Sequence, residues 1–325
     1  TGASLIVNSN GILQLHGDLL NNGAFEDNGT LDIAGNDNVT IPGGTYTNLK
    51  ISGGNILNID APLTTTGNLD LINGKIFLGD NDFTIGNAGT ITNQSSSSYF
   101  VINGTGKLIQ NNIGSGGKSG NIIFPVGTSS QSYTPLTLNN ALGAADNFSI
   151  SMSDGVYSNY SGFNPIGSPL NSSAVKKTWY INEGITGGSN ATLTLQWNQE
   201  DELPGFNRSA MFMSRYNGTN WVPGPLGTAS GNNPFTFSRN NISSFSPRAV
   251  ASEGSILPLT LLEFNGSIIN NNAVLNWKTS NEVNTQEFII ERSIDGRNDN
   301  AIGAELSLNT SGTHQYNFTD TSIAS

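Results

Sequence analysis

Short stretches of alternating apolar and polar residues, separated by glycine and asparagine, recur over the first 112 residues at intervals of about 20 residues. The stretch NLDLINGKIF from Asn68 echoes DLLNNGAF from Asp18, so that Gly23 and Gly74 take equivalent places. A coil of a parallel β-helix buries its inward side chains only by stacking on the next coil, which needs this kind of repeat. The pattern predicts a parallel β-helix-like repeat region over residues 1–113. Antiparallel hairpins that turn at Asn-Gly (22–23 and 73–74) are the alternative.

The composition points to the same fold class. Charged residues make up only 11% of the 325 residues, against about 25% in a typical globular protein. Polarity comes instead from Asn, Ser, Thr and 39 glycines. Such a composition favours strands and turns over helices. The sequence therefore predicts an all-β protein, long enough for two or three domains.

The charge and the cysteine content exclude several classes of partner and of chemical site. The 24 acidic and 13 basic residues give a net charge of −11, and the basic residues form no cluster along the sequence. We therefore expect neither nucleic acid nor an anionic lipid surface as a partner. The chain has no cysteine, which excludes disulfides, thiolate metal sites and cysteine nucleophiles. No apolar run approaches the roughly 20 residues of a membrane span, so none is expected.

Two further zones follow the repeats. Short strands spaced by about 8 to 12 residues over 114–252, with Pro, Gly and Asn between them, predict an antiparallel β-sandwich. After the linker-like SEGSI, alternation over 253–325 predicts a small immunoglobulin-like or fibronectin type III-like sandwich, in which Trp277 faces inward with Val274 and Phe288. The expected core and rim of the middle zone are Trp179, Trp197, Phe206, Phe212, Trp221 and Phe245.

The last zone carries a specific resemblance. LPLTLLEFNGSI, NWKTSNEVN and EFIIERSIDGRN resemble the fibronectin-like module that precedes the C-terminal sorting domain in surface proteins exported by the type IX secretion system of Bacteroidetes. Residues 257–262, 277–284 and 288–296 match that module almost position for position. FPVGT, KKTWYINEG, LQWNQEDELPGFNR and SSFSPRAVA are similar to a sandwich that often stands before it, and the repeats are similar to those of adhesin-like proteins from the same group.

The resemblance implies a location outside the cell and an incomplete last sandwich. In the family, the strand that matches HQYNFTD is followed by about two more strands, which this sequence lacks. Their lack would leave unpaired backbone groups near 316–319 and open the core around Trp277 and Phe288. A strand from a neighbouring chain, such as ASLIVNSN from Ala3, would fill the gap and build a head-to-tail filament. The alternative is that the missing strands belong to the same polypeptide.

Three consecutive carboxylates, at Glu200, Asp201 and Glu202, form the most acidic run. Several carboxylates together are typical Ca²⁺ ligands, and a carboxylate pair can also serve a glycosidase. However, consecutive residues in a strand point to opposite faces, and acidic residues before Pro204-Gly205 are ordinary in turns. We therefore interpret the run as a solvated turn, keep these three residues as a candidate Ca²⁺ site, and expect no other cofactor.

The remaining polar motifs predict no catalytic site. Asp80 and Asp82 in LGDNDF fit turn capping better than a polysaccharide lyase centre, and His16 and His314 lie about 300 residues apart. The sequence thus predicts a non-enzymatic, extracellular or cell-surface protein with a structural or adhesive role, whose partners are other protein chains, including its own copies, and surface polysaccharide. The rival is a secreted β-helix protein that binds or degrades polysaccharide.

Overall fold

The computed structural model describes residues 4–20, 24–54, 56–161, 164–252, 260–280, 282, 285–294, 296–308, 310 and 312–322. Strands make up 57% of the structure and helices 1%, which confirms the all-β prediction. The hairpin considered at Asn22-Gly23 and the linker at 253–256 lie outside the described residues.

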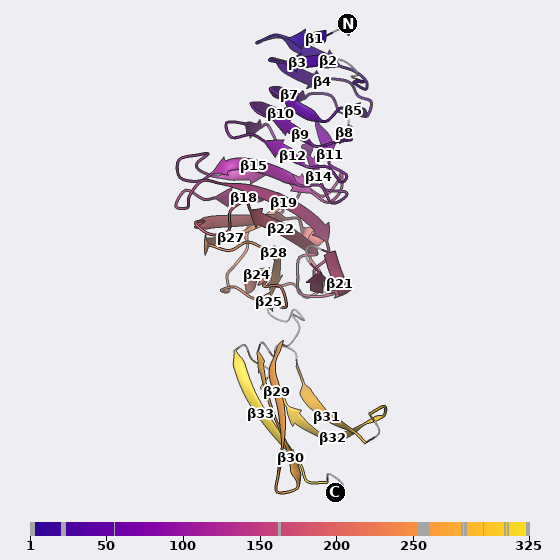
Figure 1. Ribbon diagram of the computed structural model, residues 1–325, viewed down its shortest axis with the longest axis vertical. Helices are drawn as coiled ribbons and strands as arrows, with labels where there is room; N and C mark the ends of the chain where they lie inside the picture. Colours follow the sequence, from indigo (N-terminus) through magenta and orange to yellow (C-terminus); the bar gives the residue numbers. More distant parts are fainter. Residues whose placement is uncertain are drawn as a thin grey trace.

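The N-terminal part is a β-solenoid of about five turns, as predicted (Figure 1). Successive coils add one strand to each of three parallel sheets. The first sheet contains β2 (Ile12–Leu15), β4 (Thr30–Ile33), β7 (Asn48–Ile51), β10 (Asn68–Leu71) and β13 (Thr90–Thr92). The second contains β5 (Val39–Ile41), β8 (Ile56–Ile59), β11 (Gly74–Phe77), β14 (Ser98–Val101) and β17 (Val126–Gly127). The third begins with β6 (Gly44–Tyr46), β9 (Leu63–Thr65), β12 (Phe83–Ile85) and β15 (Leu108–Ile113). Beside them, β1 (Ser4–Val7) pairs with β3 (Ala24–Asp27).

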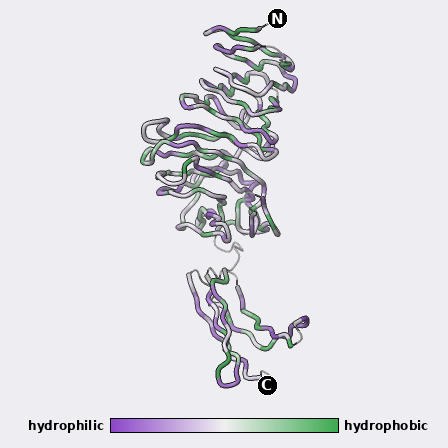
Figure 2. Tube along the Cα trace, in the orientation of Figure 1, coloured by the Kyte–Doolittle hydropathy of each residue, from purple (hydrophilic) through white to green (hydrophobic). Residues whose placement is uncertain are grey.

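Stacked leucines and isoleucines hold the coils together. Leu31, Leu49 and Leu69 lie in register on neighbouring strands, and each is fully buried. Hydrophobic and hydrophilic residues alternate along each coil (Figure 2) because successive side chains of a strand point to opposite faces. The hairpin alternative at Asn73-Gly74 is wrong: β10 and β11 belong to different sheets, and each pairs in parallel with the coils before and after it.

The third sheet continues beyond the solenoid. β15 pairs in parallel with β12 on one edge and antiparallel with β19 on the other, where Leu108 lies opposite Ile150. One cluster of buried apolar residues likewise runs from Leu31 to Val250. The sheet and the core therefore pass through the expected boundary at residue 113 without interruption. The strands added to this sheet are β19 (Asp146–Asp154), β22 (Lys177–Glu183), β28 (Pro247–Ser252), β24 (Met211–Tyr216) and β25 (Trp221–Val222).

A fourth, antiparallel sheet shares that core. Leu136, Leu193 and Leu195 from this sheet belong to the same buried cluster as Phe148 and Trp179 of the third sheet. Its strands, in order, are β16 (Ile122–Phe124), β18 (Leu136–Asn139), β23 (Ala191–Trp197), β27 (Phe235–Ile242) and β26 (Ser230–Gly231). A two-stranded sheet of β20 (Tyr157–Ser161) and β21 (Asn164–Pro169) and one 3₁₀ turn, η1 (Gln199–Asp201), complete this zone.

The C-terminal part has a separate core. β29 (Thr260–Ile269), β30 (Asn272–Ser280) and β33 (Thr313–Asp320) form one sheet, and β31 (Glu287–Ser293) and β32 (Asp299–Leu306) form another. Trp277, Ile290 and Tyr316 are buried between them, with Leu275 and Phe288 packed alongside. The expectation that Val274 faces inward with Trp277 was wrong. Positions three apart in a strand lie on opposite faces, so Leu275 takes that place.

Candidate functional site

The acidic run folds into the 3₁₀ turn η1 and its C-terminal neighbour, directly after β23. Asn198 begins the turn, and its backbone N–H donates to Asp201 Oδ2 at 3.0 Å. Glu200 is exposed, Asp201 is buried, and Glu202 is partly buried. The three carboxylates therefore have different surroundings, although they are consecutive in the sequence.

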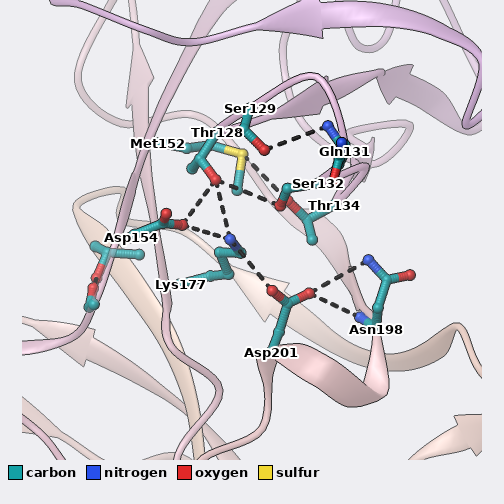
Figure 3. Close-up of polar contacts among 12 residues, drawn as sticks. Thr128, Ser129, Gln131, Ser132, Thr134, Met152, Asp154, Lys177, Asn198 and Asp201 are labelled. Carbon is teal, nitrogen blue, oxygen red and sulfur yellow. Dashed lines mark hydrogen bonds and ion pairs between the residues drawn. The ribbon is translucent and has the colours of Figure 1, made fainter.

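Asp201 faces a buried lysine (Figure 3). The Nζ atom of Lys177 lies 3.2 Å from Asp201 Oδ1, and both side chains are almost inaccessible to solvent. The same ammonium also contacts the carboxylate of Asp154 and donates to Thr128 Oγ1 at 3.0 Å. Lys177 begins β22, Asp154 ends β19, and Thr128 directly follows β17. One ammonium thus connects the end of the solenoid's second sheet, the third sheet and the acidic turn.

Glu202 is held by other partners. Its carboxylate accepts the indole N–H of Trp197 at 2.8 Å and two guanidinium hydrogen bonds from Arg208, at 2.8 Å from Nε and 2.7 Å from Nη2. The Arg208 guanidinium in turn lies over the ring of Phe235 at 3.9 Å. The two hydrogen bonds to the carboxylate and the contact with the ring together fix the orientation of the guanidinium. This carboxylate therefore fastens β23 to the segment that follows the turn.

These contacts bear on the candidate Ca²⁺ site at Glu200, Asp201 and Glu202. Within the part of the chain that the structure describes, no three His, Asp or Glu side chains are grouped closely enough to hold a metal ion. Asp201 and Glu202 already neutralise Lys177 and Arg208. Ca²⁺ binding at Glu200, Asp201 and Glu202 stays a prediction, and the arrangement as it stands serves to join elements.

Asp80 and Asp82 also join elements. Asp80 Oδ1 accepts the backbone N–H of Thr105 at 2.9 Å and its hydroxyl at 3.0 Å, and Asp82 Oδ1 accepts the backbone N–H of Lys107 at 2.9 Å. All three bonds reach from one coil of the solenoid to the next. The two carboxylates thus cap the stacked turns.

Polar side chains on the outer face of the first sheet form two columns. Asn48 Oδ1 accepts the backbone N–H of Asn68 at 2.9 Å, and Asn68 Oδ1 accepts the hydroxyl of Thr90 at 3.0 Å. In the second column, Asp32 is 1% exposed and accepts from Ser52 at 2.6 Å. These side chains therefore bond to the neighbouring coils. In register, the columns are Thr30, Asn48, Asn68 and Thr90, and Asp32, Lys50, Asp70 and Thr92.

The C-terminal part presents an apolar groove of about 200 Å³ between its two sheets. Its walls include Phe264 and Trp277 from one sheet and Phe288 and Ile289 from the other. β31 pairs only with β32 among the described strands, so no described strand lies along its other edge. Phe264 lies opposite Trp277 in the sheet and therefore on the same face, yet it is 58% exposed, which is unusual for a large apolar side chain on the core side of a sheet.

Comparison with known proteins adds no functional assignment. No family model, curated protein or solved structure matches the chain. Among the described residues, no helix has the length and apolar character needed to cross a membrane.

Proposed function

We propose that the chain is a non-enzymatic structural or adhesive module that acts outside the cell or on its outer surface. The observation that supports this proposal best is the continuous sheet from β6 to β25, which joins stacked coils and antiparallel strands over one core. An unbroken hydrogen-bonded sheet suits a stalk that must hold two ends apart. The polar groups described above are committed to holding elements together. The likeness to type IX-exported surface proteins supports the location.

The proposal includes the finer architecture. In it, the third and fourth sheets form a β-sandwich after residue 113, and residues 260–320 form an immunoglobulin-like sandwich that is open beside β31. The groove next to Trp277 and the edge of β31 that no described strand covers support this. An added strand would satisfy the backbone groups of β31 and cover Phe288. A second copy of the chain that supplies this strand would produce a head-to-tail filament.

Self-association tests the filament, and surface binding tests the adhesive role. We expect light scattering to give a mass that rises above 34.2 kDa with concentration. Phe264→Lys puts a charge in the groove beside Trp277 and should yield monomers, whereas Ile294→Lys, at an 85% exposed position outside the groove, should behave as the parent chain. A parent chain that stays monomeric would refute strand exchange between copies.

The adhesive role has its own measurement. Beads that carry the chain should attach to bacterial surface polysaccharide or to beads that carry a second copy, and chromatography should find the polysaccharide unchanged in length. Shortening of the polysaccharide that is lost in Asp80→Ala or Glu202→Ala would instead favour the rival enzyme. Beads that attach to neither surface would overturn the adhesive part of the proposal.

A further inference from the structure

Two arginines occupy directly opposed positions on neighbouring strands. Arg215 of β24 lies in register with Arg248 of β28. Opposed residues of an antiparallel pair project to the same face, where two like charges repel each other. Arg248 is only 4% exposed, so solvent does little to screen this repulsion. The pair is unfavourable unless something negative lies close by.

A third arginine approaches from the other sheet. Arg239 of β27 pairs with Leu193, a fully buried core residue, so its side chain leaves the fourth sheet on the side that faces the core. All three arginines line one cavity of about 150 Å³, together with Ser243 and Ser244. The sequence gives no sign of this cluster, since the three residues are separated by 24 and 9 positions (239 − 215 and 248 − 239).

Two guanidinium donors of this cavity are not satisfied. Arg248 Nη2 donates to the backbone oxygen of Ser244 at 2.8 Å. Arg248 Nε and Arg239 Nη1 are buried and have no hydrogen-bond acceptor. The ion pairs found within the described residues include none of the three arginines, although the chain carries 24 acidic residues. Buried guanidinium groups are normally paired, because an unpaired buried charge is costly.

Protonation behaviour is consistent with this excess of positive charge. Burial, followed by the positive charges of Arg215 and Arg239, lowers the pKa of Arg248 to about 10. Burial also lowers the pKa of Arg239. Both groups remain cationic at neutral pH, so the cavity holds a net positive charge that the protein itself leaves uncompensated.

We propose that this cavity, lined by Arg215, Arg239 and Arg248, binds an oxyanion: a sulfate, phosphate or carboxylate group. Guanidinium groups present donors in a planar fork that matches two oxygens of such an anion. The free Nε of Arg248 and the free Nη1 of Arg239 supply donors from opposite sheets, and Ser243 and Ser244 also line the cavity. A bound anion satisfies the orphaned donors and removes the repulsion between Arg215 and Arg248.

Gly224 makes room for this arrangement. A Cβ atom at Gly224 would lie 1.5 Å from Arg239 Nη1, so any side chain there must displace the guanidinium. The other nearby atoms include the backbone oxygen of Met213, at 2.8 Å from the same Cβ. Gly224→Ala therefore moves the Arg239 guanidinium without removing a charge, which separates positioning from net charge.

Isothermal titration of the full chain with sodium sulfate, sodium phosphate and sodium acetate, against sodium chloride at equal ionic strength, tests the proposal. We expect saturable 1:1 binding of at least one oxyanion and none of chloride. The acetate arm separates a carboxylate site from a site for tetrahedral anions. Thermal unfolding should show a matching rise in Tm, since a ligand that binds only the folded state stabilises it.

Variants locate the binding. Arg239→Met and Gly224→Ala should each weaken oxyanion binding about tenfold or more, whereas Lys176→Met, which removes a positive charge elsewhere in the same zone, should leave it unchanged. Circular dichroism of each variant verifies the fold, and if Arg239→Met does not fold, Gly224→Ala decides. The proposal is overturned if no oxyanion binds more tightly than chloride, or if binding survives unchanged in the folded variant.

Discussion

Lys177 and Asp201 form an ion pair, with Nζ 3.2 Å from Oδ1, in which the side chains are only 3% and 4% exposed. Removing two charges from water is costly, and their attraction offsets this cost only when further hydrogen bonds complete the site. Here Thr128 accepts from the lysine, and Asn198 donates to the aspartate. The pair therefore joins β22 to the turn η1, and each charge depends on the other for its stability in the interior.

Lys177→Met should destabilise the chain by about 3–5 kcal/mol, because it leaves the buried carboxylate of Asp201 without its cation. Urea unfolding followed by tryptophan fluorescence measures the change. Lys176→Met is the control, since Lys176 is the neighbouring residue and is only partly buried. A loss of less than about 1 kcal/mol for Lys177→Met would place the pair among ion pairs of surface strength.

The solenoid was predictable from the sequence because its determinants are local. Leu31, Leu49 and Leu69 recur at the interval of one coil, and the same period places glycine and asparagine at the turns. The strand period also fixes which residue faces inward, and it places Leu275, not Val274, on the face of Trp277.

The continuation of the sheet past residue 113 was not predictable in this way. It depends on β15 pairing with β19, where Leu108 meets Ile150 across 42 residues (150 − 108). Local alternation says that both segments are strands but not which strand lies beside which. For the same reason, the sequence did not predict the burial of Lys177 or the meeting of the three arginines between two sheets.

Trp197→Phe should cost more stability than Trp221→Phe. The indole N–H of Trp197 donates to the carboxylate of Glu202 at 2.8 Å, whereas that of Trp221 donates to the backbone oxygen of Tyr157 at 2.7 Å. Hydrogen bonds to charged groups contribute about 1.5–3 kcal/mol, against about 0.5–1.5 kcal/mol for neutral ones. Both tryptophans are buried, so the change in volume is matched. Urea midpoints that fall equally would contradict the role given to Glu202.

Gly53→Ala should destabilise the solenoid by about 1–3 kcal/mol through overpacking. A Cβ atom there would lie 1.8 Å from the backbone oxygen of Gly35 on the preceding coil. The adjacent Gly54→Ala is the control, because the nearest atom to its Cβ, Asn73 Nδ2, would be 3.4 Å away. Thermal unfolding should give a Tm for Gly53→Ala that lies well below the Tm of Gly54→Ala. Equal Tm values would show that the coils can separate without cost.

The C-terminal part should lose stability in acid through Glu282. Burial alone would raise the pKa of Glu282, but hydrogen bonds donated by Thr279, Tyr316 and Ser307 hold it below its ordinary value of 4.5. A pKa that is lower in the folded state means that the ionised carboxylate stabilises the fold. That contribution is fully present above pH 4.5 and is lost as the pH falls through the lower, folded-state pKa.

Glu282→Gln should therefore lower hydrogen-exchange protection of β33 at pH 7 and reduce its dependence on pH below about 4.5. Protection factors, corrected for the intrinsic effect of pH on exchange, are the measurement. Glu287→Gln is the matched control, because Glu287 is an exposed residue of β31. Since hydrogen bonds from Ser322, and after them the contact with Arg292, also lower the pKa of Asp320, some acid sensitivity should remain in Glu282→Gln. If Glu282→Gln and Glu287→Gln lose protection along the same curve in acid, Glu282 does not carry the effect.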